Sequence, residues 1–228
     1  MKKNTGDSRF SIKYFLYFVL ALGFITAVAQ PFNNKKNKTI SPENKAIAAA
    51  TITDATTIND KSDADKKREE ESANAFNEVY KVLMHPRCMN CHPSGDAPLQ
   101  GDDSHIHVQN VTRGPDGKGL YAMKCSNCHQ SENVAGLNMP PGNPNWHLPP
   151  ANMKMIFQGR TPAQLARQLK DPKQTGKSMT QLLEHVEHDK LVLGGWNPGD
   201  GRTLPPMSHE EFAKNFREWI EKGAAIPQ

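Results

Sequence analysis

Apolar side chains recur at helical spacing shortly before residue 86. The set follows the i, i+3, i+4, i+7 pattern of an amphipathic helix and consists of Phe76, Val79, Tyr80 and Leu83. Pro86 interrupts this pattern, because proline lacks the backbone N–H that a helix interior needs. The sequence therefore predicts a helix that ends near Pro86.

Three more helices are predicted from start signals that precede apolar faces. Thr161 and Pro162 open one of them, with proline in the first turn, where its missing N–H costs nothing. Ser178 and Ser208 open the other two, and Gln181 and Glu211 three residues later complete a capping box in each. The apolar faces are Leu165 and Leu169, then Leu182, Leu183 and Val186, and last Phe212, Phe216, Trp219 and Ile220.

The segments between these helices are rich in proline and glycine and have no regular period. They comprise residues 93–120, 130–160 and 191–206. Residues 116–119, with the sequence Asp-Gly-Lys-Gly, predict a tight hairpin in the first of them. The chain therefore has the pattern of an all-α fold with long loops. Long loops in a compact domain are usually functional.

The N-terminal residues have a different pattern, with a basic flank followed by an apolar run. Four cationic residues precede the run from residue 14 to residue 29, which ends in a small-x-small triplet at 27–29. Residues 1–29 are therefore predicted to be a signal peptide for export. An uncleaved anchor is the alternative, although 16 apolar residues are fewer than the roughly 20 that span a bilayer.

Residues 30–72 are polar and are predicted to form a disordered linker, which leaves 73–228 as the folded domain. Within the linker, the charged run 66–71 is interpreted as a solvated helix start. The net charge of +4 resides mostly in residues 1–72, which hold 12 basic and 9 acidic side chains against 16 and 15 in residues 73–228. This charge does not indicate a nucleic-acid partner.

All four cysteines belong to two copies of the pattern Cys-x-x-Cys-His. The copies are Cys88, Cys91 and His92, and Cys125, Cys128 and His129. This pattern is the attachment signature of haem c: the two thiols bond to the macrocycle and the histidine is the proximal iron ligand. The sequence therefore predicts two covalently attached haem c groups.

Three other interpretations explain the cysteines less completely. A disulfide framework suits an exported protein but does not require a histidine after each second cysteine. A zinc site leaves both histidines unexplained, and 33 residues separate the pairs, where about 15 to 20 is usual. A thioredoxin-like site would need one motif in a βαβ context, which the pattern lacks.

The motifs, together with the segments 85–88, 145–150 and 216–224, resemble bacterial dihaem c-type cytochromes from Phe76 to the end. More narrowly, the chain is similar to cytochrome proteins labelled as an isoquinoline 1-oxidoreductase subunit. The resemblance implies cytochrome c-like helices with long loops wrapped around two haems, and the first and last helices are expected to pack together or onto haem. It also implies electron transfer beside a molybdenum hydroxylase, without catalytic residues in this chain. The N-terminal signal predicts a location in the periplasm or on the outer face of the cytoplasmic membrane. A small dihaem peroxidase-like enzyme and a haem-based sensor are the alternatives.

The sixth ligand of each iron is open, and four residues are candidates. His107 follows His92 by 15 residues, and His147 follows His129 by 18, as in a weak internal repeat. Met139 lies between prolines and glycines, ten residues after His129, and would more easily reach the first haem than the second. Met207 is the fourth candidate. His185 and His188 are expected at the surface or in caps.

Overall fold

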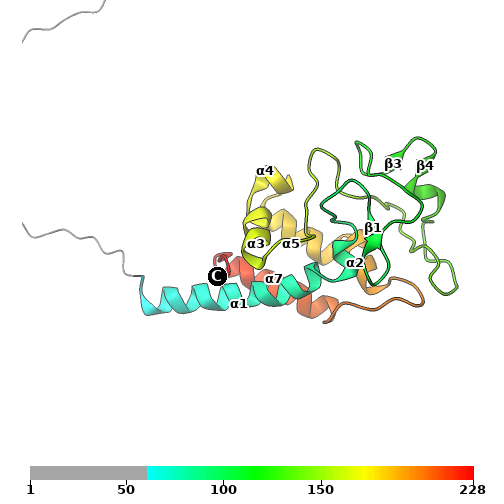
Figure 1. Ribbon diagram of the computed structural model, residues 1–228. Helices are drawn as coiled ribbons and strands as arrows, with labels where there is room; N and C mark the ends of the chain where they lie inside the picture. The colour runs from blue at the N-terminus through cyan, green and yellow to red at the C-terminus, as the bar shows by residue number, and fades with distance from the viewer. Residues whose placement is uncertain (1–60) are drawn as a thin grey trace, which may run out of the picture. The chain divides into compact units, whose positions relative to one another are not determined.

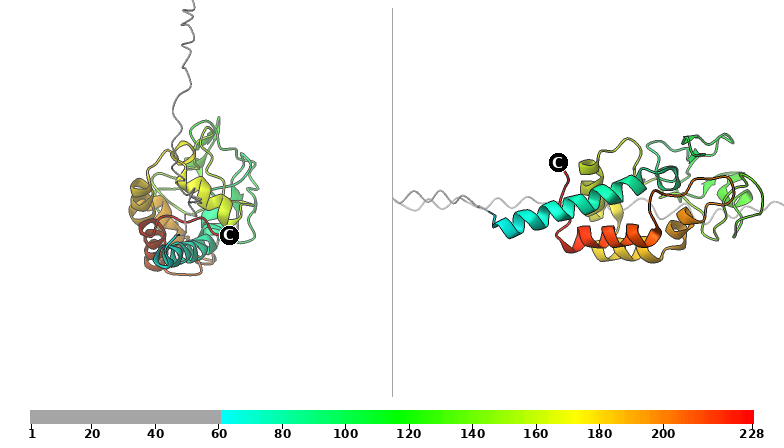
Figure 2. Two further views of the ribbon diagram at one scale, coloured as in Figure 1. Left: turned by 90° about the vertical axis from the view of Figure 1, so that its left-hand side faces the viewer. Right: turned by 90° about the horizontal axis from the view of Figure 1, so that it is seen from below.

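The structure is a computed structural model that describes residues 61–228, so the predicted signal peptide and linker residues 30–60 lie outside the described residues. The α-helices are α1 (Asp63–Leu83), α2 (Pro86–Met89), α3 (Pro162–Lys170), α4 (Pro172–Thr175), α5 (Met179–His188), α6 (Lys190–Leu193) and α7 (His209–Glu221). Short 3-10 helices span Cys125–Asn127 and Gly194–Trp196. Helices α1, α3, α5 and α7 gather at one end of this part, and long loops form the other (Figures 1 and 2).

Two short antiparallel hairpins lie in the loop region. Strands β1 (Leu99–Gln100) and β2 (His105–Ile106) form one, and β3 (Gly119–Leu120) and β4 (Met123–Lys124) form the other. The hairpin predicted at 116–119 is displaced: β3 begins at Gly119, and its turn contains Tyr121 with a positive φ of 49°. The backbone at Gly117 instead packs closely against the backbone of Leu148. A Cβ at this position would lie 1.9 Å from the Leu148 carbonyl oxygen, so only glycine fits.

Helix α1 begins ten residues before the predicted start of the domain at residue 73, so the segment 63–72 is helical and the linker boundary was wrong. Ser62 caps the helix by accepting a hydrogen bond of 3.2 Å from the backbone N–H of Asp65. The carboxylates of Asp63 and Asp65, in the first turn, interact favourably with the positive end of the helix dipole. The run 66–71 lies in the first turns of α1 and is mostly exposed, as predicted for a solvated helix start.

The first and last predicted helices pack against each other, as expected. The buried Ser72 hydroxyl donates to the Trp219 carbonyl at 2.8 Å and accepts from the Ala225 N–H at 3.0 Å. The rings of Phe76 and Trp219 are tilted, with centroids 4.6 Å apart. The core around this contact consists of Ala75, Phe76, Val79, Val82, Leu83, Phe157, Leu165, Ala166, Leu169, Leu182, Val186, Phe212, Phe216, Trp219 and Ala224.

The three predicted helix starts are confirmed. Thr161, Ser178 and Ser208 each occupy the N-cap and form a reciprocal capping box with the residue three positions later. The predicted loop 191–206 is interrupted, however, because α6 and a 3-10 turn extend to Trp196. Asp189 starts α6 by accepting a hydrogen bond of 2.8 Å from Leu191 N–H. Within residues 61–228, no helix has both the length and the apolar character needed to cross a membrane.

Candidate functional site

Each Cys-x-x-Cys-His motif lies on a tight helical turn. In the first, the His85 ring caps α2 by accepting from the Arg87 N–H at 3.3 Å, and the N–H of His92 donates to Met89 at 2.9 Å. In the second, the N–H of His129 donates to the Cys125 carbonyl at 2.9 Å. Such turns place the histidine directly after the two thiols on a compact segment, as attachment along one edge of a macrocycle requires.

The imidazole of His92 is oriented by two partners from a distant loop. Its Nδ1 lies 2.7 Å from the carbonyl oxygen of Met155, and its ring stacks on Phe157 with centroids 3.8 Å apart and planes 8° apart. Backbone bonds fix that loop to the motif, since Phe157 N–H donates to the His92 carbonyl at 2.9 Å. Burial lowers the pKa of His92 to about 4, so the ring is neutral at pH 7.

The imidazole of His129 is held in the same way by different residues. Its Nδ1 lies 2.7 Å from the Pro141 carbonyl oxygen, and its ring stacks on Trp146 with centroids 4.0 Å apart and planes 8° apart. Burial lowers the pKa of His129 as well. Two histidines with different acceptor and stacking residues therefore have the same local geometry.

This geometry leaves one nitrogen of each imidazole available to a metal. A carbonyl oxygen only accepts hydrogen bonds, so Nδ1 carries the proton and the lone pair of the neutral ring is on Nε2. Within residues 61–228, neither Nε2 has a hydrogen-bond partner. Metal-ligating histidines typically donate their other ring N–H to a carbonyl or carboxylate, which fixes the tautomer and the ring orientation. Both side chains therefore suit the axial position of a haem iron.

The four thiols form no disulfide. Burial raises the pKa of Cys88 to about 12 and that of Cys91 to about 11, and it also raises the pKa of Cys125. In the part of the chain that the structure describes, no three side chains of His, Cys, Asp or Glu gather closely enough to hold a metal ion directly.

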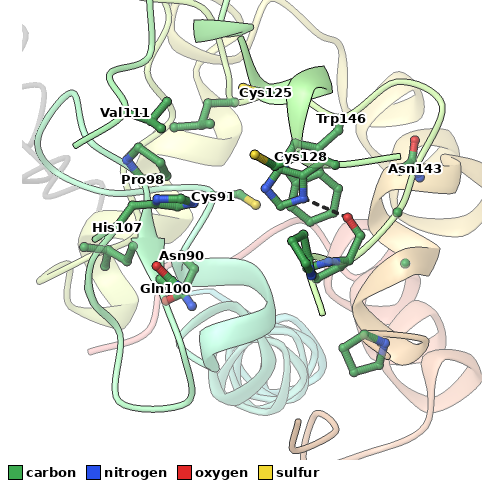
Figure 3. Close-up of a pocket in the computed structure, with 18 of the residues that line it drawn as sticks. Asn90, Cys91, Pro98, Gln100, His107, Val111, Cys125, Cys128, Asn143 and Trp146 are labelled. Carbon is green, nitrogen blue, oxygen red and sulfur yellow. Dashed lines mark hydrogen bonds between the residues drawn. The ribbon is translucent and has the colours of Figure 1, made fainter. Parts of the chain in front are cut away.

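Both motifs contribute to one cavity of about 240 Å³ (Figure 3). Cys91 comes from the first motif, and Cys125, Cys128 and His129 come from the second. Much of the remaining lining is apolar and consists of Pro86, Pro98, Leu99, Val111, Met123, Pro140, Pro141, Trp146, Leu148, Leu191 and Pro198. An apolar cavity with thiols and an imidazole at its edge has the chemistry that a porphyrin needs.

Cationic side chains also line this cavity. Arg87 forms an ion pair with Asp102, and Arg202 donates to the carbonyl oxygens of Pro198 and Asn138, both at 3.1 Å. Because these guanidinium groups are held at the cavity wall, they suit the carboxylates that a haem carries.

Arg113 joins two of the long loops, 93–120 and 130–160, and is only 1 % exposed. Its guanidinium donates to the carbonyl oxygens of Pro149 at 2.5 Å and Gly95 at 3.1 Å, and its Nε lies 3.8 Å from the Asp96 carboxylate. Its own N–H donates to the Asp96 carbonyl at 2.7 Å. The loop region therefore has a buried polar centre in place of the apolar core of the helices.

The four candidates for the sixth ligand lie in different surroundings. His107 lines the cavity. His147 and Met139 do not line it: Nδ1 of His147 lies 2.6 Å from the Asn145 carbonyl oxygen, and the Met139 side chain is 40 % exposed. Met207 is packed against the helical core.

His185, which the sequence assigns to the surface or a cap, is partly buried near the first motif. Its Nδ1 lies 2.9 Å from the Asp189 carboxylate. The pKa of His185 is lowered by burial and, to a smaller extent, by positive charge on Lys177 and His147, whereas Asp189 raises it.

No local sequence pattern indicates the partners of the two histidines. Met155 and Phe157 lie more than sixty residues after His92, in a loop without a helical or alternating period. Trp146 lies in the loop 130–160, whose sequence has no regular period. A backbone acceptor such as Pro141 has no side-chain signature at all.

Compared with known proteins, the chain matches no protein-family model, no curated relative and no solved structure. The assignment of the site therefore depends on the motifs and on the geometry around them.

Substituting Gly142 with alanine is expected to disturb the second motif selectively. A Cβ at this position would lie 1.9 Å from the Glu132 carbonyl carbon, and the preceding residue supplies the acceptor for His129. The loop must shift, at a cost of about 1 to 3 kcal/mol. Thermal unfolding and NMR of the His129 ring would measure both effects. Gly95→Ala is the control, because a Cβ there meets nothing within 4 Å; equal effects in the two variants would contradict the prediction.

Proposed function

We propose that this chain is an exported dihaem c-type cytochrome that transfers electrons between a partner oxidoreductase and the respiratory chain. Cys88 and Cys91 bond one haem and Cys125 and Cys128 bond the other, while His92 and His129 are the proximal ligands. When bound, each haem supplies a one-electron redox centre. Export and a periplasmic location follow from the signal predicted in residues 1–29.

The main support for this proposal is that His92 and His129 make equivalent contacts with unrelated residues. Each has Nδ1 at 2.7 Å from a backbone carbonyl oxygen and a parallel aromatic ring on one face. A disulfide framework needs neither feature. The arrangement is typical of imidazoles that bind a metal through Nε2.

The shared cavity supports electron transfer over substrate chemistry. Cys91 and Cys125 both line it, so the attachment edges of the two haems would lie close together. This gives an electron a short path from one redox centre to the other. The partner is proposed to be a redox protein, and the resemblance described above implies a molybdenum hydroxylase.

The test is haem stoichiometry in protein that is expressed with a periplasmic cytochrome maturation system. Intact-protein mass spectrometry should show two haems, which stay on the chain in denaturing gels. Cys88→Ala/Cys91→Ala and Cys125→Ala/Cys128→Ala should each retain one haem. Ser126→Ala, which changes an exposed residue inside the second motif, should retain both.

Two outcomes would contradict the proposal. Chains that mature without covalent haem would reject the cofactor, whichever cysteines are present. A protein that carries both haems but turns over peroxide rapidly would reject the carrier function and favour the peroxidase-like alternative.

A further inference from the structure

His107 faces the histidine of the other motif. Its ring centroid lies 6.5 Å from that of His129, with the two planes inclined at 58°. His107 lies in the loop after β2, and it lines the cavity together with Cys125 and Cys128 (Figure 3). The weak repeat in the sequence would associate it with His92 instead.

The distance between the two ring centroids is that expected for two imidazoles that bind one metal atom between them. Two imidazoles on one metal ion have centroids about 6 Å apart, because each metal–nitrogen bond is about 2 Å long. Rings in direct contact lie closer, as His129 does to Trp146 at 4.0 Å. The inclination of 58° is compatible with axial ligation, since an imidazole can rotate about its bond to the metal.

The ring of His107 also lacks a partner of its own. Its Nδ1 is buried and makes no hydrogen bond in residues 61–228. An imidazole nitrogen without a hydrogen bond is free to bind a metal. The backbone is fixed on both sides, because the N–H of His107 donates to Pro98 at 3.0 Å and its carbonyl accepts from Asn110 at 3.1 Å.

We propose that His107 is the sixth ligand of the iron whose proximal ligand is His129. This inference rests on the proposed function, since it requires a haem at the second motif. The loop that follows the first motif would thus be bound to the second haem, and the two haem sites would be interlocked. The second haem would be bis-histidine and low-spin.

The experiment assigns the ligand with single-haem proteins. Cys88→Ala/Cys91→Ala carries only the second haem, and Cys125→Ala/Cys128→Ala carries only the first. In the first background the reduced protein should bind no carbon monoxide, and adding His107→Ala should create one binding site per chain. In the reciprocal background, His107→Ala should leave carbon monoxide binding unchanged.

His105→Ala is the matched control, because it changes a histidine two residues away whose ring is exposed and paired with Asp103. It should leave the second haem closed to carbon monoxide. His107→Met, made in the two-haem protein, should introduce a methionine-to-iron charge-transfer band at one haem and raise its reduction potential.

Three results would overturn the assignment. They are carbon monoxide binding by the second haem with His107 intact, no new binding site in His107→Ala, and a new site only at the first haem. Failure of both backgrounds to acquire any haem would instead reject the proposed function, so the two failures are distinguishable.

Discussion

Replacing Arg113 with methionine is expected to lower the free energy of unfolding by about 2 to 4 kcal/mol. The guanidinium donates to carbonyl oxygens in two loops, and both would be left without a partner in a buried site. Hydrogen bonds from a charged donor contribute more than neutral ones, and the desolvation cost of the lost charge offsets part of the effect. Denaturant titration of the full chain would measure it.

Arg217→Met is the control for this prediction. It removes the same side chain from an ion pair with Glu187, but Arg217 is about half exposed, and surface ion pairs contribute little. Arg113→Lys should lie between the wild type and methionine, because lysine keeps the charge but loses the planar fork. Equal losses in Arg113→Met and Arg217→Met would contradict a structural role for Arg113 in the loops.

Replacing Trp219 with alanine is expected to cost about 3 to 5 kcal/mol, the range for deleting a large buried aromatic side chain. Trp219 is fully buried between Phe76 and Phe216, and its indole N–H donates to the Ala225 carbonyl at 2.9 Å. The substitution would leave a cavity where α1 and α7 meet. Thermal and chemical unfolding should both record the loss.

Trp219→Phe separates the two contributions, because it keeps most of the ring volume and removes only the indole N–H. It should cost less than Trp219→Ala. Leu204→Ala, at a side chain that is 57 % exposed, should change stability by no more than about 0.5 kcal/mol. A loss in Trp219→Ala as small as that would mean that the contact between α1 and α7 contributes little.

The helices were predictable because their signals are local. Each N-cap, at Thr161, Ser178 or Ser208, forms its capping box with a residue only three positions later, so the whole signal is contained in four consecutive residues. The start of α1 was predicted only in part: the run 66–71 was interpreted as a helix start, whereas the domain boundary was placed at residue 73. Residues 63–72 are polar enough to suggest a linker, but a serine cap and contacts to α7, such as Lys222 to Glu71 at 2.8 Å, support a helix there.

The chemistry of the site was predictable only in part. The cysteines and histidines of the two motifs are recognisable from spacing alone, whereas the stacking rings and carbonyl acceptors come from loops that have no period. The weak repeat relates His107 to His92 along the chain, but sequence separation does not decide which cavity a side chain enters. The ring of His107 lies beside His129.

The hydrogen bonds that orient His92 and His129 close loops of very different length. His129 and its acceptor Pro141 are 12 residues apart, whereas His92 and Met155 are 63 apart. Closing the longer loop costs about 1.5 kcal/mol more in chain entropy. The setting of His129 can therefore form while most of the chain is still unstructured, whereas that of His92 must wait for the return of residues 155–157. During folding the imidazole of His129 would therefore be oriented before that of His92. On partial unfolding, the imidazole of His92 would be released before that of His129.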